Sequence, residues 1–523
     1  MILGLGGFDH NGAVCAAAGG AITAFLEAER PARAKNLGLS SPEIIDATLA
    51  ALGPLPPPAH IALADARFTE RASSWLMPYL DRRFPGVPRT IHHHHDCHLA
   101  CAFAASPFDR ATAVSLDAAG DGLAAATGVA TRALPAKRTL QVASRHSLGR
   151  LWWAVSEYCG MPSHHAAGKT MALAAYGEPR FLDALAAACP LLADGRYEWS
   201  GPPEDPERFR EMTGALAWIE ALTGAPRARG EPAQIHKDVA ATMQAWTVRV
   251  VSHVVRAAVA ATGIRDVCIA GGVALNGLAN EALLRDGVVD RLFVPSCPDD
   301  RGLAIGAACL AAAARGEPIV AVRDGLDPFL GAPASGEIPA GFTVVSADLD
   351  VIAARLVAGD LLAICDGRDE AGPRALGRRS LLASPASSSL RARLNDITGR
   401  EQFRPFGCSL PAEHAAKWLG MRGDSPYMLR IVEVPPAVRD RIPAVVHVDG
   451  TTRPQTVSRD RQPFLHALLC RLEAHGHPPL LLNTSLNGRS EPLAHSRADA
   501  FAIASKLGLD GVISDGALYR SSP

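Results

Sequence analysis

Short apolar runs that end in glycine-containing turns recur along the first part of the chain. Residues 1–7 (MILGLGG) predict a strand, residues 8–12 (FDHNG) a turn, and residues 13–30 further strand material. The same order returns at residues 112–134, where TAVSLDAAGDG leads into LAAATGVATRAL. Two strand–turn–strand units of one design indicate an internal duplication.

A third element lies at residues 266–284 (DVCIAGGVALNGLANEALL), where a buried strand precedes a Gly-Gly turn and a helix. The backbone N–H groups of such a turn can approach a nucleotide closely. Helical spacing marks residues 42–53 and 237–261 between these elements. Paired strand–turn–strand units are the design of the actin-like phosphotransferases and sugar kinases, so we expect an α/β domain of that architecture.

The pattern changes after the duplicated part. Residues 316–342 are rich in Gly, Pro and Ala and show no periodicity, which predicts a domain boundary. An α+β-like segment follows, with helices at 349–359 and 463–476 and strands at 360–365 and 479–488. We therefore divide the chain into a domain of residues 1–325, a linker of residues 326–342 and a second domain of residues 343–523.

Composition fits a globular enzyme with two domains. The chain has 523 residues, more than one core usually holds, with 48% hydrophobic and 20% charged residues. The formal net charge of -1 argues against a dominant electrostatic grip on nucleic acid. We expect no membrane span and no signal peptide. The 11 cysteines are scattered in apolar surroundings, which favours free thiols and a cytoplasmic location.

The run IHHHHDCHLACAF contains a candidate metal site. On a helix His94 and His98 lie about one turn apart on one face, the spacing that chelates a metal. Asp117 in DAAGDG and Asp300 in CPDDRG could complete the coordination. Imidazoles with carboxylates suit Fe(II), Mn(II) or Zn(II), and the sequence does not choose among them. The alternative interpretation is a solvated histidine-rich loop.

Two further motifs in this part of the chain bear on catalysis. His10 lies in the first turn, where a neutral imidazole could take a proton from an attacking hydroxyl; the alternative is a turn histidine without a role. Gly168-Lys169-Thr170 suggests a phosphate loop, but Ser163 replaces the first glycine and the preceding segment has a helical pattern. We therefore reject the phosphate loop.

Arginine without lysine is concentrated in the second domain. Eight arginines and no lysine lie between residues 368 and 404, and Arg374 is in a Gly-Pro-Arg-Ala-Leu-Gly turn. A guanidinium offers a rigid fork to phosphate or carboxylate, so the pattern favours an oxyanion pocket. Arg453, Ser485 and Arg489 have similar loop contexts and could complete it. High-GC coding bias and salt bridges are the alternative explanation.

These residues resemble the ATP-dependent O-carbamoyltransferases of the NodU/CmcH type, over nearly the whole chain. Ten segments in the family's order carry the resemblance: AERPARAK, HHDCHLACAFAASPF, SLDAAGDG, GKTMALAAYG, IAGGVALNG, PDDRGLAIGAA, DEAGPRALGRRSLLASP, REQFRPF, HVDGTTRPQTV and LLNTSLNGRSEP. The resemblance implies an N-terminal domain of the actin-like (ASKHA) fold, similar to the TsaD-like enzyme of tRNA threonylcarbamoylation. It implies a YrdC-like C-terminal domain.

The resemblance also implies a reaction and a set of site residues. The C-terminal domain converts carbamoyl phosphate and ATP, with Mg, to carbamoyladenylate, and the N-terminal domain transfers the carbamoyl group to a hydroxyl. His94, His98, Asp117 and Asp300 then resemble the Fe(II) ligands, and His10 the general base. The other implied contacts are Lys35, Gly271, Gly272 and Asn276 for the adenylate, and Arg374, Arg404, Arg453, Ser485 and Arg489 for carbamoyl phosphate and ATP.

The chain departs from the family's pattern at three places. No lysine precedes Arg400-Glu401, so a phosphate contact could move to an arginine such as Arg400. Asn11 replaces the aspartate that usually follows His10, and Asn36 follows Lys35 where histidine is frequent. These departures concern individual contacts rather than the reaction class.

Three functions follow as hypotheses. The first is carbamoyl transfer to a small-molecule natural product, such as an antibiotic, with no nucleic-acid or membrane partner. The second is threonylcarbamoyl transfer to tRNA, which the neutral charge disfavours. The third is a non-catalytic actin-like scaffold. Acceptor walls are expected within residues 195–235, and apolar helical stretches leave a homodimer open.

Overall fold

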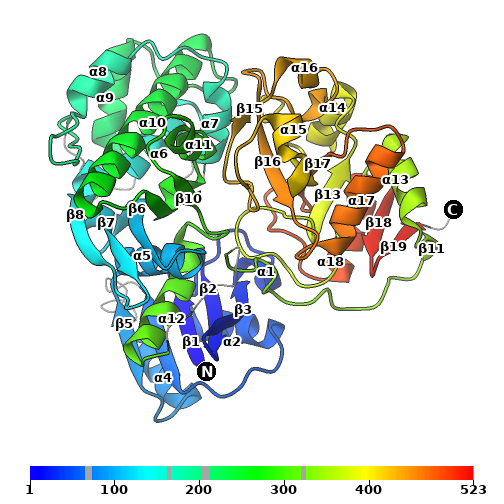
Figure 1. Cartoon of the computed structure of the whole chain (residues 1–523), viewed down its shortest axis with the longest axis horizontal. Helices are drawn as coiled ribbons and strands as arrows, with labels where there is room; N and C mark the ends of the chain where they lie inside the picture. The colour runs from blue at the N-terminus through cyan, green and yellow to red at the C-terminus, as the bar shows by residue number, and fades with distance from the viewer. Residues whose placement is uncertain (65–73, 162–165, 203–211, 318, 320–324, 522–523) are drawn as a thin grey trace. The chain divides into compact units, whose positions relative to one another are not determined.

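The computed structural model describes residues 1–64, 74–161, 166–202, 212–317, 319 and 325–521. It is a mixed α/β protein in which helices cover three β-sheets (Figure 1). Contacts divide the chain into two compact units. The first unit contains residues 1–62, 70–89 and 326–523, and the second contains residues 63–69 and 90–325.

Two five-stranded sheets have the same strand order. The first runs β3-β2-β1-β4-β5 and the second, read from its other edge, β8-β7-β6-β9-β10. Each begins with three antiparallel neighbours in chain order, which agrees with the predicted duplication. The strands are β1 (Ile2–Gly6), β2 (Ala13–Ala18), β3 (Ala21–Glu27), β4 (His60–Ala64), β5 (Arg89–His92), β6 (Arg110–Gly120), β7 (Leu123–Thr131), β8 (Lys137–Ala143), β9 (Asp266–Ala270) and β10 (Arg291–Phe293).

Helices of the second unit accompany its sheet. The helix predicted at residues 237–261 is α10, and Gly168–Thr170 lies inside α7 rather than in a phosphate-binding loop. Ser163 lies outside the described residues. The helices are α5 (His94–Ala104), α6 (Leu148–Tyr158), α7 (Ala167–Ala174), α8 (Leu182–Ala188), α9 (Thr213–Thr223), α10 (Gln234–Thr262), α11 (Gly277–Arg285) and α12 (Leu303–Ala314), with short 3-10 turns η1 (Ser144–His146), η3 (Gly272–Leu275) and η4 (Asp300–Gly302).

A nine-stranded sheet forms the largest layer of the first unit. Its order is β11-β19-β18-β12-β13-β17-β14-β16-β15. The strands are β11 (Phe342–Ser346), β12 (Leu362–Cys365), β13 (Arg379–Ala383), β14 (Gly407–Pro411), β15 (Val432–Glu433), β16 (Thr451–Val457), β17 (Leu481–Ser485), β18 (Gly511–Ser514) and β19 (Ala517–Ser521). Successive side chains of a strand point to opposite faces of the sheet. Leu381 and Leu482 therefore enter one core, while Leu382 and Leu481 enter another.

Both faces of this sheet are therefore buried under helices. One core includes Leu465 and Leu472 of α17 with Ile352 of α13, and the other includes Leu394 of α14 with Trp418 of α15. The unit's helices are α1 (Glu29–Ala32), α2 (Pro42–Ala51), α4 (Leu76–Arg83), α13 (Leu349–Val357), α14 (Ser388–Ile397), α15 (Ala415–Leu419), α16 (Pro436–Arg439), α17 (Pro463–Ala474) and α18 (Arg497–Leu507), with 3-10 turns η5 (Ala412–His414) and η6 (Pro443–Val445).

The division by contacts differs from the limits drawn along the sequence. Residues near the N-terminus pair with the segment after residue 325: the Phe25 amide donates to the Leu330 carbonyl at 3.0 Å. The limits 1–325, 326–342 and 343–523 follow composition, which carries no information on such pairing, and they stay a prediction. None of the described helices is both long and apolar enough to cross a bilayer.

Candidate active site

Helix α5 presents two imidazoles to one point in the second unit. His94 and His98 are four residues apart on it, so their rings lie on one face with centroids 4.7 Å apart. Asp117 comes from the end region of β6, and Asp300 from the turn that leads into α12. The sequence prediction that these four residues come together is therefore matched by the structure.

The four side chains converge, and we call them the histidine–aspartate cluster. One ligand atom from each of them lies within 4.8 Å of the other three. His94 Nε2 is 3.1 Å from His98 Nε2 and 3.2 Å from an oxygen of Asp117, while Asp300 is 3.4 Å from His98 Nε2. Ligands at right angles around an ion with bonds of about 2.1 Å would be roughly 3 Å apart. The donor set and its spacing thus fit a divalent transition metal.

Electrostatics also favours a cation at this cluster. Burial disfavours the charged forms, but hydrogen bonds with Asp117 and Asp300 outweigh it and raise the pKa of His98 to about 9. The partner hydrogen bonds hold the pKa of Asp117 well below its usual range in spite of its burial. Without a metal, His98 therefore carries a proton at neutral pH, and a metal ion that binds Nε2 has to displace it.

Neighbouring groups hold His94 in place. The Asp121 carboxylate accepts a hydrogen bond from the His94 amide at 2.8 Å, which fixes the start of α5. Gly120 is required beside the ring, because a Cβ there would lie 2.1 Å from His94 side-chain atoms. His95 is not part of the cluster: it contacts Ser115 Oγ, and burial lowers its pKa to about 3.

The predicted adenylate-binding turn adjoins the cluster. Gly271 has φ +88°, and a Cβ there would lie 2.1 Å from the Leu116 carbonyl oxygen, so only glycine fits. The Gly272 amide donates to Asp117 at 2.7 Å, which couples the turn to the metal-type ligands. Asn276 caps α11 by accepting from the Ala279 amide. Its amide also pairs with Gln244, so its side chain is engaged in the fold.

His10 and Lys35 belong to the first unit, in two loops that pair with each other. His10 forms an isolated β-bridge with Leu37, and the Gly12 amide donates to the Leu37 carbonyl at 2.8 Å. Asn11 is buried with φ 52°, so the turn is held in a left-handed conformation. Lys35 is exposed. The turn is well determined by its backbone contacts, and the roles predicted for both residues stay predictions.

The predicted oxyanion pocket lies along one edge of the nine-stranded sheet. Strand pairing opposes Gly407 to Arg453 on one side and to Asn483 on the other, and Ser380 to Ser485. The amino-terminal ends of β13, β14 and β16 and the carboxyl end of β17 therefore meet there. We call this the arginine edge, with the residues Arg374, Arg400, Arg404, Arg453 and Ser485.

The arginine edge brings four positively charged side chains close enough to act on one another. Burial lowers the pKa of Arg453, and the charges of Arg374, Arg400 and Arg404 lower it further. Burial likewise lowers the pKa of Arg400, with Arg404 adding to the effect. The Nε atoms of Arg400 and Arg453 are buried without a hydrogen-bond partner among the described residues. Mutually repelling guanidinium groups with unused donors are suited to a phosphate-like anion.

Two other predictions concern Arg400 and Arg489, which lie close to each other. Arg400, the arginine predicted to take over the contact of the absent lysine, stacks over Phe406 at 4.8 Å and donates to the Pro405 carbonyl at 2.7 Å. Arg489 is exposed, and its side chain lies beside Gly399, where a Cβ would be 3.2 Å from Arg489 Cδ. The structure thus brings Arg489 next to the segment that carries Arg400.

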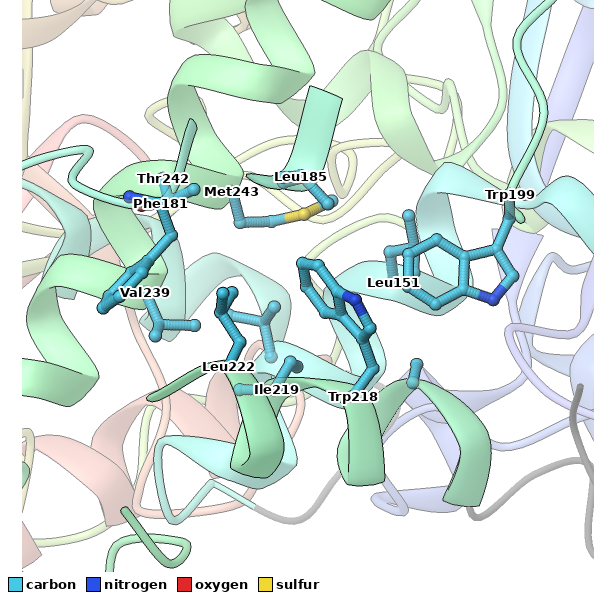
Figure 2. A pocket seen from close by; sticks show the side chains of 12 residues that line it. Leu151, Phe181, Leu185, Trp199, Trp218, Ile219, Leu222, Val239, Thr242 and Met243 are labelled. Carbon is cyan, nitrogen blue, oxygen red and sulfur yellow. Dashed lines mark hydrogen bonds between the residues drawn. The ribbon is translucent and has the colours of Figure 1, made fainter. Parts of the chain in front are cut away.

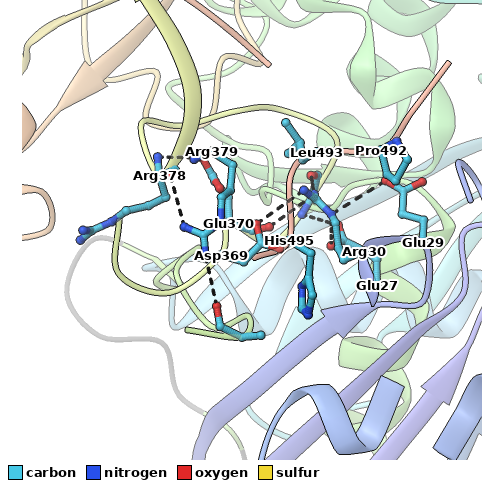
Figure 3. A network of polar contacts seen from close by, with 12 residues as sticks. Glu27, Glu29, Arg30, Asp369, Glu370, Arg378, Arg379, Pro492, Leu493 and His495 are labelled. Atoms are coloured by element: carbon cyan, nitrogen blue, oxygen red, sulfur yellow. Dashed lines mark hydrogen bonds and ion pairs between the residues drawn. The ribbon is translucent and has the colours of Figure 1, made fainter. Parts of the chain in front are cut away.

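Glu370 is a site residue that the sequence analysis missed. One of its oxygens accepts hydrogen bonds from the amides of Leu376, Arg378 and Arg379, each at 2.9 Å. This buried carboxylate therefore shapes the loop that carries Arg374 (Figure 3). Its only sequence signal was its place in the DEAGPRALG segment, which says nothing about the direction of the side chain.

Arg30 connects the AERPARAK segment to the same loop. It is fully buried, donates to the Gly372 carbonyl at 2.8 Å and pairs with Glu27 at 3.1 Å and Asp369 at 3.5 Å (Figure 3). The Gly372 amide in turn donates to Glu27 at 2.7 Å. Arg30 therefore positions the loop that carries Arg374.

Asp369 in this network makes stability depend on pH. Burial raises its pKa to about 7 against the opposing effect of Arg30. The unfolded chain ionises this residue near pH 4, so the folded state loses stability as pH rises from about 4 to 7. We expect Asp369→Asn to lose this slope and to be roughly 1–4 kcal/mol more stable than wild type at pH 8. Urea unfolding at pH 5 and 8 measures the slope, with the half-exposed Asp350→Asn as control. An unchanged slope in Asp369→Asn would contradict this prediction.

An apolar pocket lies among α6, α8, α9 and α10 of the second unit. Its walls include Leu151, Trp218 and Met243, which face a common space in Figure 2. Trp199 meets Trp218 edge-to-face with centroids 5.5 Å apart. The volume is about 20 Å³, which is room for one methyl-sized group. Part of the predicted acceptor stretch therefore builds a small apolar core, and residues 203–211 of it lie outside the described residues.

Comparison with known proteins identifies the class that this fold and this pair of sites define. Residues 80–309 match the family model described as Carbamoyltransferase N-terminus, and residues 353–520 match Carbamoyltransferase C-terminus. The histidine–aspartate cluster lies in the first match and the arginine edge in the second. The chain belongs to the carbamoyltransferase family, and it is a transferase.

Among the relatives are nodulation proteins of rhizobia. Nodulation protein NolO of Bradyrhizobium diazoefficiens is 32% identical over 450 residues, covering 82% of this chain and 79% of that protein. NolNO of Sinorhizobium fredii is 34% identical, covering 80% of this chain and 62% of that protein. Nodulation protein U of the same organism is 36% identical over 264 residues, 49% of this chain and 45% of that protein.

Solved structures resemble the chain more distantly. HypF of T. kodakarensis is 15% identical and covers 61% of this chain and 48% of that chain, with a TM-score of 0.35. That score does not establish a shared fold. The α/β class is therefore a finding, while the actin-like and YrdC-like assignments stay predictions.

Proposed function

We propose that this transferase makes carbamoyladenylate from carbamoyl phosphate and ATP and transfers the carbamoyl group to a hydroxyl of a small molecule. The observation that supports it best is the arginine edge, where the charges of Arg374, Arg400 and Arg404 act on Arg453. Ser485 ends β17 at the same end of the sheet. Such a site suits a doubly charged phosphate. Membership of the carbamoyltransferase family indicates that the transferred group is a carbamoyl group.

The chemistry explains why two sites are needed. Carbamate resists attack because its charge repels a nucleophile. The arginine edge would bind carbamoyl phosphate while water hydrolyses it to carbamate and phosphate. It would then hold the carbamate whose oxygen attacks the α-phosphorus of ATP, with pyrophosphate as leaving group. The adenylate masks the charge and makes AMP the leaving group in the second step.

The second step is assigned to the histidine–aspartate cluster, where His94, His98, Asp117 and Asp300 would hold a divalent metal. The metal ion supplies positive charge that stabilises negative charge developing in the transfer. The Gly272 amide donates to Asp117, so the glycine turn proposed to bind the adenylate adjoins the proposed metal ligands. Fe(II), Mn(II) and Zn(II) all suit these donors.

We assign His10 as the base that accepts the proton of the acceptor hydroxyl, and Lys35 as a contact to the adenylate. His10 lies in a turn that its backbone pairing with Leu37 holds in place. Because Asn11 replaces the usual aspartate, the imidazole would work without an adjacent carboxylate. The transferred proton resides on the imidazole until water removes it.

Threonylcarbamoyl transfer to tRNA is the less favoured alternative. Both matched family models are carbamoyltransferase models, and the net charge of -1 offers no general attraction for RNA. We propose a small-molecule acceptor with no nucleic-acid or membrane partner, and a homodimer remains a proposal for the assembly.

A mass-spectrometric screen tests this function. Purified protein with carbamoyl phosphate, ATP, Mg and Fe(II) is incubated with a panel of hydroxylated metabolites. A separate incubation contains tRNA with added L-threonine and bicarbonate. We expect one class of small molecule to gain a single carbamoyl group with formation of AMP. Modification of tRNA alone would favour the alternative, and an acceptor product without consumption of ATP would contradict the adenylate.

A further inference from the structure

A second group of metal-type side chains lies away from both sites. Cys470 and His466 are four residues apart on α17, and Glu413 comes from the 3-10 turn η5 that follows β14. Among the described residues, this trio and the histidine–aspartate cluster are the two groups whose ligand atoms come within 4.8 Å of one another. The arginine edge is at the other end of β14, where Gly407 begins the strand.

The hydrogen bonds of His466 leave one of its nitrogens facing the thiol. His466 Nε2 lies 2.7 Å from a Glu413 oxygen, so Nε2 carries the proton and donates it to the carboxylate. Nδ1 then has its lone pair free toward Cys470 Sγ, 3.8 Å away. With metal–sulfur and metal–nitrogen bonds of about 2.3 and 2.1 Å, tetrahedral ligands would be roughly 3.6 Å apart. A carboxylate on the remote nitrogen is the usual support of a metal-binding imidazole.

Exposure and charge set Cys470 apart from the other cysteines. It is partly exposed, whereas the other ten cysteines are buried. The carboxylates of Glu413 and Glu473 place negative charge near its thiol. The same charges favour a divalent cation, which would lower the cost of deprotonating the thiol.

We propose that Cys470 Sγ and His466 Nδ1 bind a borderline divalent metal such as Zn²⁺, with Glu413 orienting the imidazole. Glu473, three residues beyond Cys470 on the same helix face, supplies the second negative charge, and water completes the coordination. Binding releases the thiol proton. The ion bridges two successive turns of α17, and the hydrogen bond from the bound imidazole to Glu413 links the helix to the turn after β14. Its role is structural and separate from the transfer reaction.

Cobalt spectroscopy distinguishes this site from the histidine–aspartate cluster. The reduced, metal-free full-length protein is titrated with Co²⁺, because only a site with thiolate gives the near-ultraviolet sulfur-to-cobalt charge-transfer band. We expect the band in wild type and in His98→Ala, its loss in Cys470→Ser, and at least about tenfold weaker binding in His466→Ala. Zn²⁺ should displace Co²⁺ and remove the band.

His475→Ala, which removes an imidazole at the end of the same helix, should bind Co²⁺ like wild type. If Cys470→Ser folds poorly, Glu413→Gln serves as the second variant. It should weaken the charge-transfer band, because it removes the support of the imidazole but no ligand atom. Binding of Co²⁺ without any band in wild type, or an equal band in Cys470→Ser, overturns the proposal. Neither outcome bears on carbamoyl transfer, since wild type and Cys470→Ser both keep every residue of the transfer sites.

Discussion

Replacing Arg453 with alanine is expected to reduce carbamoyl-phosphate-dependent exchange of pyrophosphate into ATP by at least about a hundredfold. A lost charge-assisted contact to a phosphate in a buried site costs on the order of 3 kcal/mol, equivalent to that factor. Arg453 lies on β16 directly opposite Gly407, at the centre of the arginine edge. Its Nε is buried without a hydrogen-bond partner among the described residues, so the change breaks no hydrogen bond of this atom.

The controls separate anion binding from folding. Arg453→Lys keeps the charge but not the planar fork, and should retain part of the activity with a raised KM for carbamoyl phosphate. Arg393→Ala removes a half-exposed arginine of α14 that pairs with Asp510, and should exchange pyrophosphate at the wild-type rate. Equal losses in both alanine variants would show a general effect of arginine removal and contradict the pocket.

Replacing His98 with alanine is expected to remove the metal and to reduce transfer to the acceptor by about a thousandfold, while pyrophosphate exchange continues. His98 Nε2 lies within 4 Å of His94, Asp117 and Asp300, so its loss leaves three ligands with a gap in the centre. Loss of charge stabilisation at the transfer step is worth roughly 4 kcal/mol. Mass spectrometry measures the metal content of His98→Ala, and separate assays measure its transfer to the acceptor and its pyrophosphate exchange.

His92→Ala is the matched control for this variant, because it removes an imidazole from the same histidine run outside the cluster. Its Nε2 contacts Thr90 Oγ1 at 2.8 Å on β5. It should retain both the metal and the transfer activity. If His98→Ala keeps its metal and its transfer rate, the assignment of the cluster is wrong; if it loses pyrophosphate exchange too, the separation of the two chemistries is wrong.

Local sequence patterns predicted much of this fold. The helices at 237–261, 349–359 and 463–476 and the strands at 360–365 and 479–488 are present within a few residues of those bounds. Helical spacing placed His94 and His98 together because four residues make about one turn. Asp117 and Asp300 had no such local argument, and their addition rested on turn context and on family resemblance.

Long-range contacts account for what the sequence did not show. The burial of Arg30 depends on Gly372 and Asp369, more than 300 positions away, and no local pattern reports such a pairing. The roles of Glu370 and Asn276 depend on where their side chains point, and amide and carboxylate groups serve capping and ligand contacts equally well. Glu413 and His466 are likewise distant in sequence, although the His-x-x-x-Cys spacing on α17 was a usable signal.

The most direct test of the account uses the metal-free protein without any acceptor. Labelled pyrophosphate, ATP and Mg are supplied with and without carbamoyl phosphate, and incorporation of label into ATP is measured. Exchange that requires carbamoyl phosphate, and that disappears in Arg453→Ala but persists in His98→Ala, is the predicted result. Exchange that is absent under these conditions, or that proceeds equally well without carbamoyl phosphate, would contradict carbamoyladenylate formation at the arginine edge.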